Sequence, residues 1–244
     1  MSRELPERVE VVIAGGGFAG AATAWALARL GVTDVLVLEG AEQFGSEASG
    51  RNASMARQLS SDSVTATLLR QSVATFLDPD AELRAEARRC GSLLLVEGSA
   101  GEAWLAAAAG TGGASRVVSR DVAVARVSVL EGARFDHAIA TATDAVVDVS
   151  GLLWRYLRAA RTLGVRLVAG CPVTGIRVAD GSVTGVSTPR GDVACRMFVN
   201  AAGAWANGVG GLAGLEPLPM MPYRRHLVTT PPMDRSEERR GGEE

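Results

Sequence analysis

The sequence predicts an α/β fold, and three neighbouring segments carry this prediction. An apolar run rich in β-branched residues, Val9 to Ala14, ends in three consecutive glycines. A segment of small and apolar residues follows at positions 18–30, and a second short apolar run occupies 34–38. Strand, glycine turn, helix and strand within about thirty residues form a β-α-β unit, whose two strands are parallel and joined by a right-handed crossover.

The composition agrees with this fold class. The chain has 244 residues, of which 47% are apolar and 21% charged, enough for one large domain or two interleaved ones. Its 29 glycines and 5% aromatic residues suit α/β proteins, where tight turns use glycine and small residues pack helices onto sheets. A net charge of −2 argues against a nucleic-acid-binding surface.

The cysteines and the apolar N-terminal stretch exclude further classes. Cys90, Cys171 and Cys195 are far apart and show no CxxC spacing, so neither a disulfide framework nor a metal site is expected, and reduced thiols favour a cytoplasmic protein. Residues 11–28 are uncharged and almost long enough to span a bilayer. The three glycines within them, and the acidic segment before them, favour a strand and a glycine-turn helix over a transmembrane or signal segment.

The remaining pattern predicts helices and strands along most of the chain. Asp180-Gly181 is a typical two-residue hairpin turn, whereas residues 117–147 show no order that can be assigned. The charged segment 236–244 has no apolar residue and is expected to be disordered. Helices are expected at 64–77, 81–89, 102–109 and 151–163, and strands at 91–98, 165–168, 174–178, 182–187, 193–200 and 223–230.

The first chemical motif is Gly15-x-Gly17-x-x-Gly20, which follows a strand and opens a helix. Gly15 allows the tight turn, Gly17 allows backbone to approach a pyrophosphate, and Gly20 allows the helix to lie close to the sheet. The positive end of the helix then attracts the phosphate charge. Glu39, at the end of the second strand, is placed to accept hydrogen bonds from the ribose of an adenosine. This is the Rossmann pattern of a dinucleotide-binding unit.

Two further motifs support a bound polar ligand. Residues 46–58 concentrate small, hydrogen-bonding residues around Arg51 and Asn52, which suits a loop lying along a ligand. A third motif combines Cys171-Pro172-Val173, the hairpin, and the strand leading into Gly203 and Trp205. Glycine after a buried strand lets backbone approach a ligand lying across the strand ends.

Together the three motifs resemble the FAD-dependent D-amino-acid oxidase superfamily, in particular its glycine oxidase and sarcosine oxidase-like branch. The resemblance extends to Pro232 and is strongest over residues 11–39, 48–53, 147–152 and 201–205. It implies a Rossmann-type FAD-binding domain with an interleaved α+β substrate domain built on an antiparallel sheet. The FAD-binding domain is expected at 1–88 and 148–216, and an incomplete substrate domain at 89–147 and 217–235.

The resemblance also implies roles for individual residues. Gly15, Phe18, Ala19 and Gly20 would hold the FAD pyrophosphate, as the motif also implies for Gly17, and Glu39 would hold the ribose. Val173 would meet the adenine through its backbone. Arg57 is the one weak candidate for flavin tuning or contact with a substrate carboxylate, and an ordinary solvated arginine is an equal alternative. The other implied cofactor-binding residues are Ser49, Gly50, Arg51, Asn52, Ala53, Ala202, Gly203 and Trp205.

The implied activity is oxidation of a small amine or amino acid by hydride transfer to the flavin. No acid–base pair stands out, and His137 and His226 are expected to be structural. Ser54 stands where relatives have glycine, which is expected to alter the loop beside the flavin. Relatives also continue beyond this chain, so it is expected to be a truncated form. The alternatives are an NAD-dependent dehydrogenase, and a non-catalytic flavoprotein fragment or subunit completed by a second chain or by oligomerisation.

Overall fold

The computed structural model of the chain describes residues 4–78, 82–111, 113–224 and 226. These residues form two compact units. Among the described residues, the first unit is built from the N-terminal segment up to 52 and the segment from 149 onward, and the second from the inserted segment 53–148. The α/β class expected from the sequence is confirmed.

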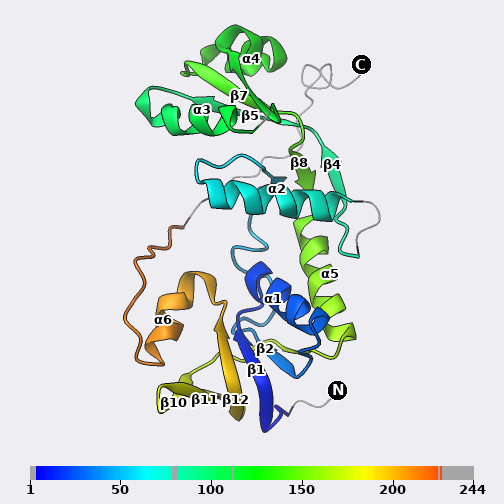
Figure 1. Ribbon diagram of the computed structural model, residues 1–244, viewed down its shortest axis with the longest axis vertical. Helices are drawn as coiled ribbons and strands as arrows, with labels where there is room; N and C mark the ends of the chain where they lie inside the picture. The colour runs from blue at the N-terminus through cyan, green and yellow to red at the C-terminus, as the bar shows by residue number, and fades with distance from the viewer. Residues whose placement is uncertain (1–3, 79–81, 112, 225, 227–244) are drawn as a thin grey trace. The chain divides into compact units, whose positions relative to one another are not determined.

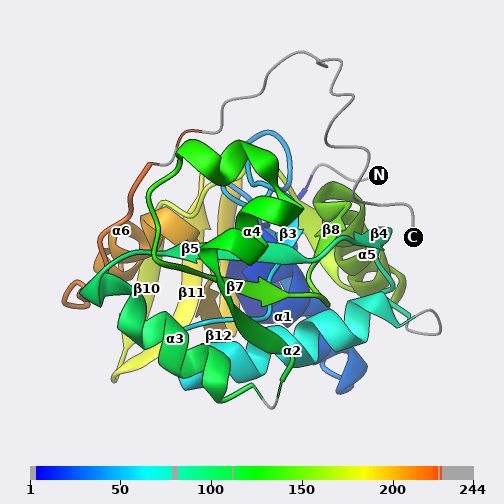
Figure 2. The same ribbon diagram turned by 90° about the horizontal axis from the view of Figure 1, so that it is seen from above.

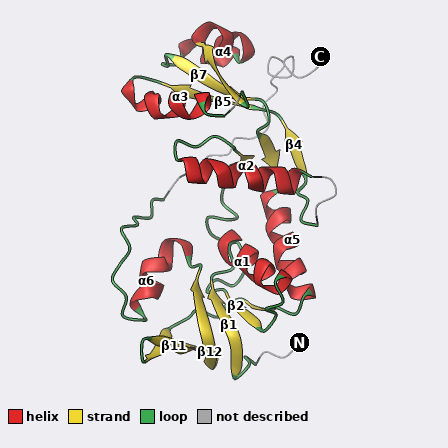
Figure 3. Cartoon of the chain, in the orientation of Figure 1, coloured by secondary structure: helices red, strands yellow, loops and turns green. Residues whose placement is uncertain are grey.

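The first unit contains a six-stranded sheet with the strand order β10-β11-β12-β1-β2-β9, of which β11, β12, β1 and β2 are labelled in Figure 3. The strands β12, β1, β2 and β9 are parallel, and β10, β11 and β12 form an antiparallel meander. The central strand β1 is buried on both faces, with Val11, Val12 and Ile13 at most 2% exposed. The strands are β1 (Arg8–Ala14), β2 (Val35–Leu38), β9 (Arg166–Val168), β10 (Gly175–Ala179), β11 (Ser182–Thr188) and β12 (Gly191–Asn200).

Two helices pack together on one face of this sheet, α1 (Phe18–Arg29) and α5 (Val149–Thr162) (Figure 1). Small side chains of α1, Ala24 and Ala28, allow it to lie close to Val11 and Val35 of the sheet. The buried residues of α5 are Leu152, Leu153, Leu157 and Ala160, which form its apolar face, and the helix expected at 151–163 is confirmed. A short 3₁₀ helix (Gly203–Trp205) and α6 (Ala206–Gly211) follow β12.

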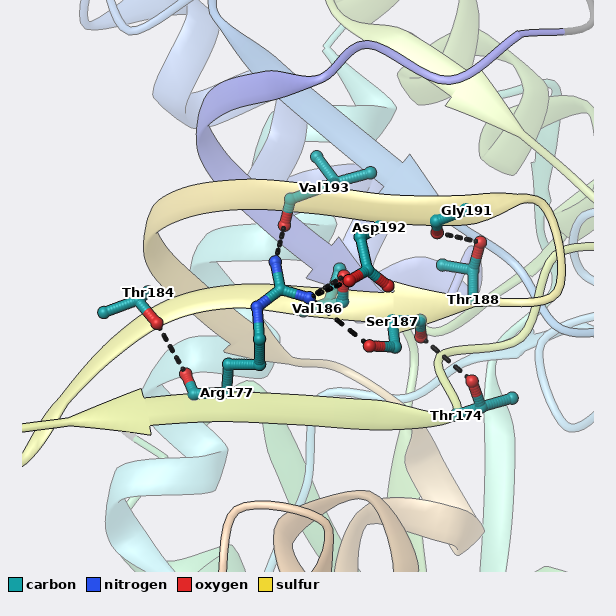
Figure 4. Close-up of polar contacts among 9 residues, drawn as sticks. All are labelled: Thr174, Arg177, Thr184, Val186, Ser187, Thr188, Gly191, Asp192 and Val193. Carbon is teal, nitrogen blue, oxygen red and sulfur yellow. Dashed lines mark hydrogen bonds and ion pairs between the residues drawn. The ribbon is translucent and has the colours of Figure 1, made fainter.

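An arginine holds the three meander strands together. The Arg177 guanidinium forms an ion pair with Asp192, with Nη1 and Oδ2 2.6 Å apart, and also donates to the Val193 carbonyl at 3.4 Å (Figure 4). It crosses β11 at the buried Gly185, where an added Cβ would lie 2.2 Å from Nη2. The turn between β10 and β11 has positive φ angles at Asp180 (51°) and Gly181 (73°), as expected for the predicted two-residue hairpin.

The second unit contains an antiparallel sheet of order β5-β7-β6, formed by Ser92–Val96, His137–Thr141 and Ser115–Ser119 respectively. Alternate side chains of β5 point to opposite faces: Leu94 and Val96 pack toward α3 (Glu102–Ala109), whereas Leu93 and Leu95 pack toward α4 (Arg120–Arg126). Figure 2 shows β5 and β7 side by side between these helices. Short 3₁₀ helices at Ser99–Gly101 and Ser128–Gly132 complete this region.

A second small sheet has the order β3-β8-β4, formed by Met55–Ala56, Ala145–Val147 and Ala87–Arg89. The helix expected at 81–89 is wrong at all of its described positions, 82–89, which contain no helix, and at 87–89 the chain forms a strand in which Ala87 pairs with Val147 of β8. Pairing with a strand distant in sequence has overridden the local helix preference.

The remaining helix of the second unit, α2 (Ser63–Leu77), begins where the Asp62 carboxylate accepts the Thr65 N–H at 2.7 Å. This helix lies within the continuous segment 53–148, so the first crossing between the two units falls at 52/53, earlier than the boundary at residue 88 expected from the sequence. The second crossing, at 148/149, lies one residue from the expected one. At 223, 224 and 226, the described positions of the strand expected at 223–230, the chain forms no strand, and the other positions of that prediction lie outside the described residues. The expected disordered tail, 236–244, also lies outside them.

Candidate dinucleotide-binding site

The site predicted from the sequence lies at the carboxyl ends of the parallel strands. β1, β2 and β12 end at Ala14, Leu38 and Asn200, and the loops after them are joined by backbone hydrogen bonds. Gly15 N–H donates to Leu38 O at 2.8 Å, and Ala201 N–H donates to Ala14 O at 2.8 Å. Loops that follow parallel strands form the usual ligand-binding edge of an open α/β sheet.

The glycines at the end of β1 are required by close backbone contacts. Gly15 has φ +110°, and an added Cβ would lie 2.3 Å from Ala201 O. A Cβ on Gly20 would lie 1.9 Å from Gly15 O, so only glycine lets α1 start this close to the loop. The first and last glycines of the motif thus have the conformational roles that the spacing predicted.

The N-terminus of α1 presents backbone donors. The first intrahelical hydrogen bond is from Ala21 N–H to Gly17 O at 2.9 Å, so the N–H groups of Phe18, Ala19 and Gly20 have no partner inside the helix. Phe18 N–H donates instead to Ser49 Oγ at 3.0 Å. A Cβ on Gly17 would lie 2.8 Å from the same oxygen. Together with the helix dipole, these donors form a site suited to a phosphate group.

The Glu39 carboxylate anchors the glycine loop. Its Oε2 accepts the Gly16 N–H at 2.7 Å, and its Oε1 accepts the Ala41 N–H at 2.8 Å. The side chain is partly buried, and each carboxylate oxygen has lone pairs for a further donor. Glu39 is therefore equipped to accept ribose hydroxyls while it holds the loop.

Residues 45–52 form a compact turn beside the glycine loop. Gly50 N–H and Arg51 N–H both donate to Glu47 O, at 2.9 and 3.1 Å, and Asn52 Nδ2 donates to Ser49 O at 2.8 Å. Arg51 also forms an ion pair with Glu47 at 3.7 Å. Because these two side chains are 71% and 48% exposed, the pair stabilises the turn little, and the backbone bonds define its shape.

The other predicted residues divide between the two units. In the first unit, Val173 packs against the hydrophobic cluster that includes Cys171 and Leu38, Gly203 follows β12 with φ +54°, and Trp205 is 59% exposed. Ala202 N–H donates to Asn200 Oδ1 at 3.3 Å. Ala53 and Arg57, both exposed, belong to the second unit.

Three residues of the site were not identified from the sequence. The side chain of Phe44 contacts the glycine loop, since a Cβ on Gly16 would lie 2.1 Å from Phe44 Cδ1. Ser46 Oγ is buried without a hydrogen-bond partner among the described residues. Asn200 Nδ2 donates to Ala206 O at 2.8 Å and so ties the end of β12 to α6. Only Ser46 had a signal in the sequence, as the first residue of the polar segment 46–58.

Aromatic residues pack beside the start of α1. Phe18 and Tyr156 meet edge to face with ring centroids 6.4 Å apart, and Tyr156 meets Trp25 in the same way at 5.6 Å. Burial raises the pKa of Tyr156 above its usual value, so this phenol stays neutral over a wide pH range.

The described part of the chain contains no group of three or more His, Cys, Asp or Glu residues that is arranged to hold a metal ion. Among the same residues, each helix is too short or too polar to cross a membrane.

Comparisons with known proteins agree with the geometry. A family model described as FAD dependent oxidoreductase matches residues 10–243. Sarcosine dehydrogenase, mitochondrial, from Homo sapiens is 30% identical over 94% of this chain and 26% of its own length. Sarcosine oxidase subunit beta from Rhizobium meliloti (strain 1021) is 30% identical over 90% of this chain and 54% of its own length. The structure of glycine oxidase from Geobacillus kaustophilus is similar with a TM-score of 0.73 and 25% identity, over 86% of this chain and 60% of that one.

These findings confirm the resemblance and the FAD cofactor expected from the sequence, and they do not favour the NAD-dependent alternative. The chain spans about a quarter of the human sarcosine dehydrogenase and about half of the bacterial subunit. Because the family model matches almost the whole chain, the protein belongs to the D-amino-acid oxidase (DAO) family of FAD-dependent oxidoreductases.

Proposed function

We propose that this chain forms the FAD-binding part of an enzyme that oxidises a small amine or amino acid. The observation that carries the proposal is the arrangement at the carboxyl end of β1. There, the open N–H groups of α1 and the Glu39 carboxylate lie on either side of one glycine loop, in a chain of an FAD-dependent family. The names of its relatives, which include sarcosine dehydrogenase and glycine oxidase, support an amine or amino acid as substrate.

The residues present fit an adenine dinucleotide. Ala19 and Gly20 offer N–H groups for phosphate oxygens, and Ser49 Oγ already accepts a neighbouring donor there. Glu39 offers carboxylate oxygens for ribose hydroxyls, as FAD requires. Ser46 Oγ, buried and without a partner among the described residues, provides a further hydroxyl within the same segment.

We assign the cofactor contacts accordingly. Gly15, Gly17, Phe18, Ala19 and Gly20 hold the pyrophosphate, Glu39 holds the ribose, and the backbone at Val173 contacts the adenine. The first unit is thus the FAD-binding domain, and the second unit, with its antiparallel sheets, contributes to the substrate domain. The remaining contacts are assigned to Ser49, Gly50, Arg51, Asn52, Ala53, Ala202, Gly203 and Trp205.

When bound, FAD accepts the two electrons removed from the substrate carbon, and the protein contributes binding, orientation and exclusion of water. The backbone N–H groups of the glycine loop and of the start of α1 would donate to the pyrophosphate, and the Glu39 carboxylate, held by the Gly16 and Ala41 N–H groups, would accept hydrogen bonds from the ribose. Arg57, exposed on the second unit, is the proposed contact for a substrate carboxylate because a guanidinium binds a carboxylate by two hydrogen bonds.

A second chain is part of the proposal. One relative is a sarcosine oxidase subunit by name. Leu215, Leu218 and Met221, in the segment after α6, are 66%, 63% and 71% exposed, which is unusual for apolar side chains so close in sequence. We propose that another subunit covers them. The three free cysteines support a reducing compartment, for which we propose the cytoplasm.

Cofactor content is the first test. The purified protein is expected to show flavin absorbance, and the cofactor released by denaturation should be identified as FAD by chromatography. The Glu39→Gln variant keeps the shape of the side chain but loses one acceptor oxygen, and it should retain less FAD than the wild-type protein. A colourless wild-type protein that binds NAD instead of FAD would contradict the proposal.

Substrate class is tested with the flavin-loaded protein, supplied with its partner subunit where one co-purifies. Anaerobic mixing with sarcosine, glycine or a D-amino acid should bleach the flavin, and the rate should rise with pH because the neutral amine is the reactive form. A flavin that is bleached by a hydroxy acid or glycerol phosphate, and by none of the amines, would show that the substrate assignment is wrong.

A further inference from the structure

Phe44 lies between the glycine loop and helix α5. A Cβ added to Gly16 would lie 2.1 Å from Phe44 Cδ1 and 2.7 Å from Cε1, so the ring occupies the space in which a side chain at Gly16 would stand. Gly16 is not one of the three glycines of the dinucleotide motif. Its lack of a side chain is explained by this ring.

Phe44 and the residue after it also pack against α5. The Phe44 and Trp154 rings meet edge to face with centroids 6.4 Å apart. The next residue, Gly45, has φ +71°, and an added Cβ would lie 2.3 Å from Leu153 Cδ2. Leu153 is itself 3% exposed within a cluster that Phe44 packs against. The ring is therefore backed by the hydrophobic core.

The Gly16 backbone links this ring to Glu39. Gly16 N–H donates to Glu39 Oε2 at 2.7 Å, and the position of a Gly16 Cβ is 3.1 Å from the same oxygen. Movement of Gly16 away from its present place would therefore lengthen its bond to the carboxylate. It would also shift the next residues, Gly17 and Phe18, which begin α1.

We infer that Phe44 is a positioning residue for the FAD site: its ring holds Gly16 against the Glu39 carboxylate, and so sets both the acceptor for the ribose and the start of α1. The inference rests on the proposed function because it concerns the same site. Phe44 acts through Gly16 and Glu39, with the rigidity of the packed core behind it.

The test combines Phe44→Ala with Gly16→Ala. Phe44→Ala is expected to weaken FAD and ADP binding about tenfold, the scale of one impaired hydrogen bond to a charged group. Gly16→Ala should weaken binding at least as much, because its Cβ meets the ring. In the double variant the added methyl group has room, so FAD should bind more tightly than to Gly16→Ala alone. Effects that simply add would overturn the inference, since residues in contact are expected to be coupled.

A matched control separates positioning from general destabilisation. Ile176→Ala removes a partly buried apolar side chain from β10 of the same unit, three strands away from β1, and should lower stability without changing the dissociation constant for FAD. Phe44→Leu keeps apolar volume in case the alanine variant does not fold, and it should weaken binding in the same direction. Equal FAD affinity in wild type and both Phe44 variants would overturn the inference while leaving the proposed function intact.

A readout without cofactor completes the design. Hydrogen exchange of the Gly16 amide, measured by NMR, should be faster in the Phe44 variants than in wild type, and unchanged in Ile176→Ala. If the wild-type protein binds neither FAD nor ADP, the proposed function fails, and this exchange measurement still decides whether the ring holds Gly16 on Glu39. Unchanged exchange would overturn that contact.

Discussion

The Ser49 hydroxyl accepts the N–H of Phe18 at 3.0 Å, which joins two residues 31 positions apart and caps the first turn of α1 from outside the helix. Ser49→Ala removes this acceptor. We expect the free energy of unfolding to fall by about 1 kcal/mol, as for other lost helix caps, and FAD to bind more weakly. Chemical denaturation and FAD titration measure the two effects. Ser49→Thr keeps the hydroxyl and should retain most of both, and equal losses in the two variants would contradict the capping role.

Ser54 adopts a left-handed backbone conformation with φ 57°, the conformation that glycine accepts without strain. Ser54→Gly should relieve about 1 kcal/mol of strain, offset in part by the greater entropy of glycine in the unfolded chain. We expect a small net gain in the midpoint of urea unfolding. Ser54→Ala, which keeps the Cβ, should show no gain, and a destabilised glycine variant would contradict the strain argument.

Arg190 holds the loop that precedes Val173. Its Nη2 donates to the carbonyls of Ala169 and Gly170, both at 3.0 Å. Arg190→Ala is expected to lower the free energy of unfolding by about 1 kcal/mol, since the side chain is exposed, and to weaken ADP binding. Calorimetric titration with ADP measures the second effect.

The control for this variant is Arg196→Ala. It removes an exposed ion pair with Glu10, 2.6 Å between Nη2 and Oε1, and should change stability by less than about 0.5 kcal/mol. ADP affinities that fall equally in the two variants would show that the carbonyl contacts of Arg190 are not specific to the loop.

Two weak acids, the buried Cys195 thiol and the partly buried Tyr156 phenol, predict the response to alkaline pH. Burial raises the pKa of the Cys195 thiol, partly offset by the nearby Arg177 charge, and burial raises the pKa of Tyr156. A raised pKa in the folded state means that both groups stabilise the fold below their ordinary pKa values. This contribution is lost as the pH rises through the raised values. Urea unfolding at increasing alkaline pH should show a falling midpoint.

In the double variant Cys195→Ala, Tyr156→Phe the alkaline fall should be shallower, because neither replacement ionises. The double variant is first compared with wild type at neutral pH, since the lost packing changes the midpoint there as well. An alkaline dependence identical to that of wild type would assign the titration to other groups.

The β1-α1-β2 unit was predictable because its signals are local. Gly20 is required by its contact with Gly15 O in the same turn, Gly15 has a positive φ of +110° that favours glycine, and Glu39 follows directly on β2. The strands within 117–147 were not predictable in this way, because they pair with residues distant in the sequence. Thr141, for example, pairs with both Ser92 and Ser115. The strand at 87–89 was missed for the same reason, as its partner is Val147.

The site shows the same division. Spacing identified the glycines and Glu39, which lie at fixed offsets from strand ends. Phe44 is not part of any motif with fixed spacing. It acts through a contact with Gly16, 28 positions earlier in the chain, and no sequence pattern indicates that contact. Its role follows from the packing alone.

The pairing of β1 with β12 has a consequence for synthesis on the ribosome. Arg8 pairs with Ala194, whereas β2, on the other side of β1, is only a short distance along the chain. At a synthesis rate of about 5–20 residues per second, β12 is made on the order of 10–40 s after β1. During this interval the whole inserted segment 53–148 has already emerged, with all partners of its own sheets. Both sheets of the inserted segment therefore have all their strands available before β12 is made, and until then one side of β1 is an unpaired strand edge.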